Sequence, residues 1–340
     1  MKICVVGAGW YGCHITRMLV HLNFDVTLFE SESEIITGAS ALNQNRLHLG
    51  FHYARNHRTR IQSLTGFDDF KKTYGSLLFP IEKNIYAVPQ NDSLLDFQTY
   101  KGIMSSSGLS FKECSNPDFL EGIEGSLETT EGGISVRLVK EFFHKEIGAN
   151  LRLNTKVVDI EQIDNSVIVD GQVFDFLVDC TWGHLLPLKS VFYEVSLLLV
   201  MRRRSHDWNL SVTLVDGDLW SIYGTEDRDL YTVSSVKYTP LHISSSPLEA
   251  RHFLSNVSLH VLEKAKKNIV SEVEKHFPSF RDYFNFEDYQ LSIKTKPVAL
   301  NSDRSCYVES KGRIISILSG KIDNIFYASD LVTRMIANEL

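Results

Sequence analysis

The spacing G-x-G-x-x-G at the amino terminus constrains the fold of this chain more than any other feature. Gly7, Gly9 and Gly12 provide it, directly after the apolar run 2–6. In a dinucleotide-binding unit the first glycine permits a tight turn, the second lets a pyrophosphate approach the backbone, and the third lets a helix pack against the strand. We therefore predict a buried strand at 2–6 and a helix at 11–22 whose N-terminal amides face phosphates.

A second strand and an acidic residue complete this fingerprint. Residues 25–29 have the pattern of a strand, and Glu30 follows at its end. A carboxylate at this position accepts a hydrogen bond from an adenosine ribose, and it repels a 2′-phosphate, which disfavours NADP. The pattern predicts a dinucleotide site, and a glycine turn without a cofactor is the alternative.

The segment after Glu30 favours FAD over NAD. An NAD enzyme normally continues into a helix and further parallel strands, whereas residues 41–56 are polar and rich in asparagine and histidine. An isoalloxazine ring needs backbone amides, hydroxyls and side-chain amides along an extended path away from the pyrophosphate. The segment therefore predicts a flavin.

Further matches lie in the middle and at the end of the chain. His48, Gly50 and Tyr53 have the spacing H-x-G-x-x-Y, residues 132–160 combine a glycine pair with a helix at 137–147 and a strand at 155–160, and residues 176–183 read as an apolar strand ending in a Thr-Trp-Gly turn. Residues 312–324 form a strand and a turn before a helix at 325–340. With the glycine fingerprint, these stretches resemble the D-amino-acid-oxidase-like FAD-dependent oxidoreductases, relatives of glycine oxidase, sarcosine oxidase, L-2-hydroxyglutarate dehydrogenase and glycerol-3-phosphate dehydrogenase.

The resemblance implies FAD as the cofactor and a set of residues around it. Ser40 matches a small hydroxyl residue near the pyrophosphate, Val157 matches a valine whose backbone meets the adenine, and the turn at Lys321 matches the one that closes over the flavin pyrimidine. Lys321 would add a cation where reduced flavin becomes anionic, and a solvent-exposed turn lysine is the alternative. The implied cofactor-binding residues are Gly7, Gly9, Trp10, Tyr11, Gly12, Glu30, Ser40, Arg46, Leu47, His48, Val157, Thr181, Trp182, Gly183, Gly320, Lys321 and Ile322.

Two departures indicate a distant branch of the family. The usual serine pair or Gly-Asn-Ser is replaced by residues 41–45, and the final turn, 320–323, is poorer in glycine than the family's. Both departures lie in segments matched to the flavin and leave the substrate open.

The positions of the matches predict an interleaved α/β architecture. A Rossmann-like FAD-binding domain is assembled from residues 1–72, 133–186 and 298–340, and a mixed or antiparallel substrate sheet from residues 73–132 and 187–297. Alternating patterns predict strands at 79–88, 191–200, 210–215, 219–223 and 230–236, with a turn at 216–218. One or two helices follow within 247–276, with an apolar face that reads as core rather than as a partner site, formed by Phe253, Val257, Val261, Ile269 and Val273.

The family chemistry assigns roles to the polar segment. The resemblance implies hydride transfer from a C–N or C–O bond to flavin N5, with Arg46, His48 and Lys321 as catalytic residues. His48 would take the hydroxyl or ammonium proton, and hydrogen bonding to the flavin is its alternative role. His52, Tyr53 and Tyr223 are the predicted substrate-binding residues, and packing or a bond to the main chain is the alternative for Tyr53. Arg46, Arg55 and Arg58 are candidate carboxylate clamps, but surface exposure is the favoured interpretation of Arg55 and Arg58. Trp220 and Arg304 are further pocket candidates.

The composition of the chain argues against several other classes of protein. The 340 residues carry 35 Lys and Arg against 42 Asp and Glu, and this net charge of −7 argues against binding to nucleic acid, so the run 202–204 reads as a solvated strand end. There is no apolar stretch long enough for a membrane span. The five cysteines, an odd number with no CxxC spacing, predict buried thiols without a zinc site or disulfide frame, and a cytoplasmic location.

We therefore expect an FAD-dependent oxidoreductase acting on a small amino acid, hydroxy acid or amino-sugar-like substrate, with no metal and an open oligomeric state. Two alternatives stay open: another flavoenzyme of the sugar mutase or monooxygenase type, and a binding protein that retains FAD without turnover.

Overall fold

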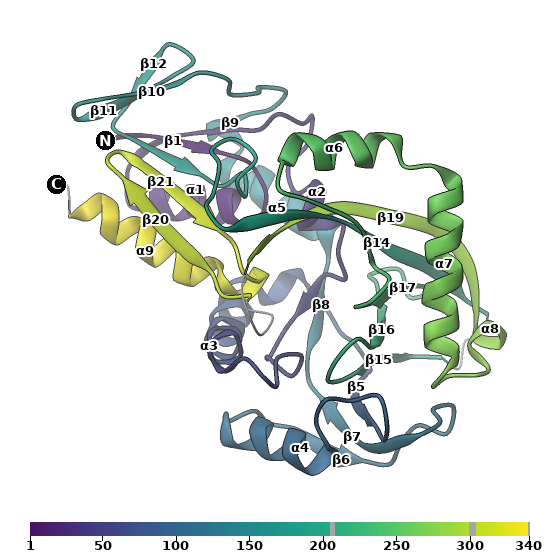
Figure 1. The fold of residues 1–340 in the computed structure, drawn as a ribbon. Coiled ribbons are helices and arrows are strands. Elements are labelled where there is room, and N and C mark those ends of the chain that lie inside the picture. Colours follow the sequence, from purple (N-terminus) through teal and green to yellow (C-terminus); the bar gives the residue numbers. More distant parts are fainter. Residues whose placement is uncertain (205–207, 299–303, 339–340) are drawn as a thin grey trace.

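The computed structural model describes residues 1–204, 208–298 and 304–338, and it combines helices with four sheets (Figure 1). The helices are α1 (Trp10–His21), α2 (Gly38–Ala41), α3 (His57–Tyr74), α4 (Phe97–Ser106), α5 (Val136–Ile147), α6 (Pro247–Asn256), α7 (Leu259–Glu274), α8 (Phe280–Tyr283) and α9 (Ile325–Ala337), with 3₁₀ turns η1 (Gly75–Leu77), η2 (Gly148–Asn150) and η4 (Ile322–Asn324).

A six-stranded sheet carries the amino-terminal motif. Its strands, in spatial order, are β20 (Tyr307–Lys311), β21 (Ile314–Leu318), β13 (Phe176–Asp179), β1 (Lys2–Val6), β2 (Asp25–Phe29) and β9 (Leu151–Arg152). All neighbours are parallel except the hairpin of β20 and β21. The core of β1 is buried on both faces because helices cover a parallel sheet on both sides. This arrangement confirms the predicted Rossmann-like α/β fold.

A nine-stranded, mostly antiparallel sheet forms the second layer. It contains β18 (Pro240–Ser244), β14 (Val191–Arg203), β17 (Leu230–Ser235), β16 (Trp220–Gly224), β15 (Leu210–Leu214), β5 (Lys83–Pro89), β7 (Ile123–Thr129) and β6 (Lys112–Cys114), and β19 (Phe284–Pro297) pairs with β14. The predicted turn at 216–218 joins the antiparallel strands β15 and β16. Ile269 and Val273 of α7 are fully buried against this sheet, so this part of the predicted apolar face is core.

Two small sheets complete the list of strands. One contains β3 (Arg46–Leu47), β8 (Gly132–Ile134) and β4 (Leu78–Phe79), and the other contains β10 (Ile160–Ile163), β11 (Ser166–Val169) and β12 (Gln172–Phe174). The first one brings the polar segment after Glu30 next to the middle of the chain.

Two strand predictions are wrong in detail. Residues 155–159 form no strand, because the carboxylate of Asp170 accepts hydrogen bonds from the amides of Val158 (3.1 Å) and Asp159 (2.8 Å), in place of a strand partner. The predicted strand 79–88 is divided into β4 and β5, because Pro80 has no amide hydrogen to donate to a ladder.

The two large sheets draw on different segments of the chain (Figure 1). The six-stranded sheet uses the start, the middle and the end, whereas the nine-stranded sheet uses segments within 83–129 and 191–297. The domain boundaries themselves stay a prediction. The last helix, α9, ends at Ala337, and the predicted end at Leu340 lies outside the described residues.

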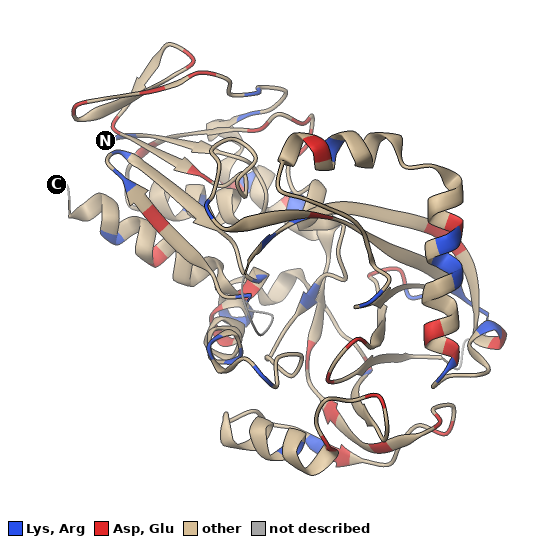
Figure 2. Ribbon diagram, viewed as in Figure 1, with Lys and Arg blue, Asp and Glu red and all other residues tan. Residues whose placement is uncertain are grey.

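Charges and thiols are distributed as follows. Along α7 the lysines lie together in the middle of the helix, with acidic residues before and after them (Figure 2). In the predicted basic run, Arg202 pairs with Glu287 at 2.9 Å. All five cysteines are free, but Cys114 and Cys180 are only partly buried, in contrast to the predicted burial. No helix in the described ranges combines the length and apolarity needed to cross a membrane.

Candidate functional site

The glycine turn after β1 has no room for side chains. Gly7 has a φ of +94°, and a Cβ at Gly12 would lie 1.9 Å from the carbonyl oxygen of Gly7. A Cβ at Gly9 would lie 2.7 Å from the hydroxyl of Ser40. The absence of a side chain at Gly12 lets α1 approach the turn, and its absence at Gly9 lets α2 approach it. This bare backbone at the N-terminus of α1 is the cradle that a dinucleotide pyrophosphate requires.

Four of the other predicted cofactor residues extend the turn. The amide of Trp10 donates to the hydroxyl of Ser40 at 3.1 Å, which fixes α2 beside the start of α1. The hydroxyl of Tyr11 donates to the carbonyl of Lys321 at 2.5 Å, which joins the first helix to the last turn. The indole of Trp10 itself packs into the core beside Phe70. Trp10 therefore lines the site mainly through its backbone.

Glu30 lies at the end of β2 beside the glycine turn. One carboxylate oxygen accepts a hydrogen bond from the amide of Ala8 at 2.7 Å, and the other accepts from the amide of Glu32 at 3.0 Å. The carboxylate therefore fixes the backbone of the loop. It lies at the position where the fingerprint places the acceptor of the hydrogen bond from the ribose.

The turn after β13 connects the two large sheets. Asp179 is buried and accepts from the amide of Thr181 at 2.8 Å, and burial raises the pKa of this carboxyl. Trp182 has a φ of +61°, its indole donates to the carbonyl of Ser319 at 3.2 Å, and its carbonyl accepts from Thr295 of β19 at 2.7 Å. Gly183, with a φ of +80°, accepts a hydrogen bond from the hydroxyl of Tyr193 at 2.6 Å.

A cavity of about 460 Å³ lies between this cradle and the nine-stranded sheet. Its volume is in the range of small-molecule and cofactor sites. Of the predicted residues, it is lined by Gly9, Trp10, Tyr11, Ser40, Arg46, His48, His52, Tyr53, Trp182, Gly320, Lys321 and Ile322, together with Arg55 and Arg304.

Arg46 forms part of the cavity wall and is held by the nine-stranded sheet. Its guanidinium donates to the hydroxyl of Thr213 at 2.7 Å and to the side chain of Gln44 at 2.6 Å, and it lies 4.1 Å from the centroid of the Tyr223 ring. Tyr223 is fully buried behind Arg46 and does not line the cavity, which places this predicted substrate residue one layer away. Leu47 is also fully buried, because it points into the core from β3.

His48 and His52 are the two imidazoles that face the cavity. Their ring centroids are 5.9 Å apart, and the Nδ1 atoms of both rings have no hydrogen-bond partner in the described structure. Burial lowers the pKa of both imidazoles well below 6.5, and the charges of Lys321 and Arg46 lower them further. Both rings are therefore neutral near neutral pH and can accept a proton.

Lys321 and Tyr53 face each other across the final turn. The ammonium of Lys321 lies 4.8 Å from the centroid of the Tyr53 ring. Burial and the charge of Arg304 lower the pKa of Lys321, while the nearby carboxyl of Asp323 opposes this shift. Burial raises the pKa of Tyr53 to about 12, so this phenol stays protonated.

Glu131 is a buried acid behind the polar segment that the sequence analysis missed. Its carboxylate accepts from the amide of Leu49 at 2.7 Å, from the hydroxyl of Tyr86 at 2.7 Å and from the side chain of Asn84 at 3.1 Å. The ring of His52 packs at 6.2 Å, edge on, against the ring of Tyr86. The acid thus supports the backbone beside His48 and the ring beside His52, although neither partner is near it in sequence.

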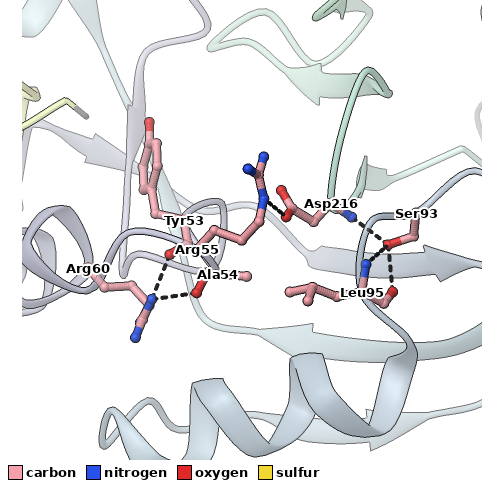
Figure 3. A network of polar contacts seen from close by, with 7 residues as sticks. All are labelled: Tyr53, Ala54, Arg55, Arg60, Ser93, Leu95 and Asp216. Atoms are coloured by element: carbon pink, nitrogen blue, oxygen red, sulfur yellow. Dashed lines mark hydrogen bonds and ion pairs between the residues drawn. The ribbon is translucent and has the colours of Figure 1, made fainter. Parts of the chain in front are cut away.

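Arg55 and Arg58 are engaged away from the centre of the cavity. Arg55 forms an ion pair with Asp216, whose backbone amide donates to the hydroxyl of Ser93 (Figure 3). Close to this pair, the guanidinium of Arg60 donates to the carbonyl of Tyr53. Arg58 is exposed, and its guanidinium lies 4.8 Å from the ring of Tyr307. Both arginines are exposed, which agrees with the interpretation that the sequence favoured over a carboxylate clamp.

The remaining predicted residues support the site from the core. Val157 is buried in a small cluster with Phe29 and Val6 at the edge of the six-stranded sheet, so its backbone role stays a prediction. Trp220 is almost fully buried, and its indole nitrogen has no partner in the described structure. Among the described residues, no group of three His, Cys, Asp or Glu side chains is arranged to hold a metal ion.

The cavity also exposes side chains that the sequence analysis did not single out. Lys294 and Lys296 of β19 and Glu194 of β14 line it. Lys294 and Lys296 are two residues apart on a strand, so the sequence places both side chains on one face of the sheet. Only the pairing of β14 with β19 shows that this face meets the cavity.

Comparisons with known proteins agree with this geometry. A sequence model of the "FAD dependent oxidoreductase" family matches residues 2–290. Over 338 residues the chain is 41% identical to the FAD-dependent monooxygenase FPY4 of Fusarium mangiferae, covering 98% of this chain and 91% of that one. It is 25% identical to the FAD-dependent monooxygenase kojA of Aspergillus flavus, covering 99% and 86%.

Solved structures share the fold at lower identity. Glycine oxidase from Geobacillus kaustophilus superposes with a TM-score of 0.71 at 13% identity, covering 99% of this chain and 94% of that one. L-α-glycerophosphate oxidase from Mycoplasma pneumoniae, with FAD bound, superposes with a TM-score of 0.74 at 14% identity, covering 99% and 94%.

Proposed function

The chain belongs to the FAD dependent oxidoreductase family, and on this basis we propose that it oxidises a C–O or C–N bond of a small polar molecule in the cavity between its two large sheets. The substrate is proposed to be a hydroxy acid, an amino acid or an amino-sugar-like compound. The observation that carries the proposal is the pair of imidazoles, His48 and His52, which both line the cavity and whose buried Nδ1 atoms have no hydrogen-bond partner in the described structure.

The residues present fit FAD. The side-chain-free turn at Gly7, Gly9 and Gly12 suits the pyrophosphate, and Glu30 suits the ribose. Tyr11 and Trp182 both bond to the segment 319–321, so the cavity continues from the turn to Lys321 without a break in its wall. When bound, FAD supplies a two-electron oxidant.

The chain's own contribution is proton transfer and charge. His48 is the proposed base, because its lowered pKa keeps the ring unprotonated and able to take a hydroxyl or ammonium proton from the substrate. Lys321 and Arg46 place positive charge on the same cavity, which favours any anion that develops there. Arg46 is held by Thr213 and Gln44, so its charge is preorganised.

A monooxygenase is the second candidate. It is supported by the names of FPY4 and kojA, of which the first is 41% identical to this chain. The same residues would then bind a substrate that receives an oxygen atom, and an external reductant would be needed.

An anaerobic titration of the FAD-loaded protein tests both candidates. Bleaching of the yellow colour by a hydroxy acid, an amino acid or an amino sugar supports direct oxidation. Bleaching that requires NADH or NADPH, with incorporation of labelled oxygen from O₂ into the product, supports the monooxygenase. If neither route reduces the bound flavin, the remaining hypothesis is a binding protein that retains FAD without turnover. A cytoplasmic location stays a prediction from the cysteine content.

A further inference from the structure

Asp323 is a fully buried acid in the final turn, and it has no role in the proposed reaction. It belongs to η4, two residues after Lys321, and its exposed fraction is 0%. Neither of its carboxylate oxygens has a hydrogen-bond partner in the described structure. Burying an ionised carboxylate without a partner is costly, so this acid requires either a proton or a nearby positive charge.

Helix α3 encloses the acid on one side. Ser63 and Gly66 are three residues apart on α3, so they share one face of the helix. A Cβ at Gly66 would lie 2.0 Å from the carbonyl oxygen of Asp323 and 3.1 Å from its Cβ, so the helix packs directly against the turn. The hydroxyl of Ser63 lowers the pKa of the acid, although the described structure has no hydrogen bond between the two groups.

The cation that acts on Asp323 is Lys321. Among the described residues that line the cavity, Lys321 is present and Asp323 is not, so the acid can influence the cavity only through its neighbours. The hydroxyl of Tyr11 donates to the carbonyl of Lys321 at 2.5 Å, and the side chain of Asn324 accepts from the amide of Lys321 at 3.1 Å. These bonds hold the acid and the lysine in one fixed turn.

Most of the surroundings oppose a positive charge on Lys321. Burial and the charges of Arg304 and Arg46 lower its pKa, whereas the charges of Asp323 and Glu131 raise it. The carboxylate of Glu131 is already engaged by hydrogen bonds from a backbone amide, a hydroxyl and a side-chain amide. The carboxylate of Asp323 has no such partner in the described structure, so its charge is available to the lysine.

The dependence between the two charges is mutual. Burial raises the pKa of Asp323, and the charge of Lys321 lowers it. Two groups coupled in this way titrate as a pair, because each charge is favoured while the other is present. The other titratable groups that feel one of the two charges are Tyr11, His48, His52, Tyr53, Lys294, Lys296 and Cys306.

We propose that Asp323 is the counter-charge that keeps Lys321 protonated, so that the cation in the cavity wall depends on a buried acid that does not line the cavity. The pair then has a net charge of zero and presents Lys321 to the cavity. This inference rests on the proposed function, in which the charge of Lys321 favours an anion that develops in the cavity. Asp323 is a positioning residue, because it acts through Lys321.

Competitive acetylation measures the protonation of Lys321. The FAD-loaded protein, and the same protein after removal of FAD, are treated briefly with acetic anhydride at a series of pH values, and the modified peptides are quantified by mass spectrometry. Only the neutral amine reacts, so the pH of half-maximal labelling gives the pKa of Lys321. We expect Asp323→Asn to lower this pKa by about one pH unit or more, because the lysine loses its nearby opposite charge.

Matched controls separate this effect from a general one. Lys264, an exposed lysine of α7, is the internal reference in every digest and should label equally in all variants. Asp330→Asn removes an exposed acid of α9 and should leave the pKa of Lys321 unchanged. An unchanged pKa of Lys321 in Asp323→Asn would overturn the proposal. A lowered pKa in Glu131→Gln but not in Asp323→Asn would also overturn it, since Glu131 would then be the counter-charge.

The reciprocal variant, Lys321→Met, tests the acid even if Asp323→Asn does not fold. Infrared spectroscopy of the FAD-free protein at pH 8 detects the C=O stretch of a protonated carboxyl. We expect this band in Lys321→Met, where the acid has lost its cation, but not in the wild type or in the double variant with Asp323→Asn. The same band in the wild type, or no band in Lys321→Met, would overturn the proposal.

Neither measurement needs a substrate, so the two proposals can fail separately. If no substrate bleaches the flavin but Asp323→Asn lowers the pKa of Lys321, the proposed function is wrong and the counter-charge is confirmed.

Discussion

The carboxylate of Glu131 accepts a hydrogen bond from the backbone amide of Leu49 at 2.7 Å, so a buried acid fixes the chain directly after His48. The same carboxylate accepts hydrogen bonds from the hydroxyl of Tyr86 and from the side-chain amide of Asn84. The cavity wall therefore depends on one acid in the short connection between β7 and β8.

Glu131→Gln should destabilise the protein. The new amide group would present hydrogens to the Tyr86 hydroxyl and the Asn84 amide, so buried donors would lose an acceptor, at a cost of about 1–3 kcal/mol. Urea unfolding of the FAD-free protein measures the change. Tyr86→Phe, which removes one donor and keeps the ring beside His52, should cost less. A Glu131→Gln protein as stable as the wild type would contradict this account.

Gly12→Ala should impair FAD binding. Its Cβ would lie 1.9 Å from the carbonyl of Gly7, so α1 must move away from the turn, with a strain of about 1–3 kcal/mol. We expect weaker FAD binding in a fluorescence-quenching titration and a lower melting temperature. Gly102→Ala is the matched control, because Gly102 lies in α4 with open space around its Cβ, and alanine favours helix there. Equal loss in both variants would argue against a specific role for the close approach at Gly12.

The ion pair of Arg55 and Asp216 should contribute little to the stability of the fold (Figure 3). Its larger effect should be to limit the access of solutes to the cavity. The Arg55 side chain is 39% exposed, so solvent screens the pair, and we expect a coupling of about 1 kcal/mol or less in a double-mutant cycle of Arg55→Met and Asp216→Asn. Both side chains line the cavity, and the pair joins two loops at its edge. We expect iodide to quench the bound flavin more strongly in either single variant than in the wild type, and unchanged quenching would count against this role.

Lys294→Met should stabilise the FAD-free protein, with an effect that depends on pH. The pKa of Lys294 is lowered to about 7 from 10.5, so between these values the unfolded chain binds more protons than the folded one, and wild-type stability rises with pH. The charges that face this ammonium are Lys296, Arg304, Lys321 and Glu194. The gain from the substitution, about 1–3 kcal/mol, should be largest at pH 7 and below and should fade toward pH 10.

Urea unfolding at pH 6, 7, 8.5 and 10 checks this window, with Lys264→Met as the exposed control. A gain of equal size at all four pH values would show that Lys294 keeps an ordinary pKa in the folded protein, and a gain that grows toward pH 10 would show a raised pKa. Either result would contradict the prediction.

His48→Gln should slow anaerobic flavin reduction by about 10²-fold to 10⁴-fold once a reducing substrate is found, because the variant lacks the base. The pH dependence of the reduction rate should lose its acid limb, which lies below 6.5 in the wild type because the pKa of His48 is lowered. His144→Gln alters a half-exposed histidine of α5 and should change neither measurement. A His48→Gln enzyme with an unchanged profile would leave His52 as the candidate base.

The local elements around the glycine turn could be predicted from the sequence. β1, α1, β2 and Glu30 follow one another within 30 residues, and their form depends on apolar periodicity and on the steric freedom of glycine. The dinucleotide site and the Rossmann-like fold followed from this segment, whereas the preference for FAD over NAD came from residues 41–56 and from the family resemblance. The prediction failed at residues 155–159, where the side chain of Asp170 takes the backbone hydrogen bonds of a strand.

The composition of the cavity wall was decided by tertiary structure alone. Glu131 reaches Leu49 across 82 positions, and Lys294 meets the cavity only through the register of β19 against β14, since a slip of one residue would turn it to the other face. Sequence showed that Arg55, Arg58 and Lys294 are cations, but only the fold gave Arg55 an acid, left Arg58 at the surface and gave Lys294 no ion-pair partner among the described residues. The glycine turn is a local property of the chain, whereas the pairing of the charged side chains in the cavity wall depends on which distant acids the fold brings near.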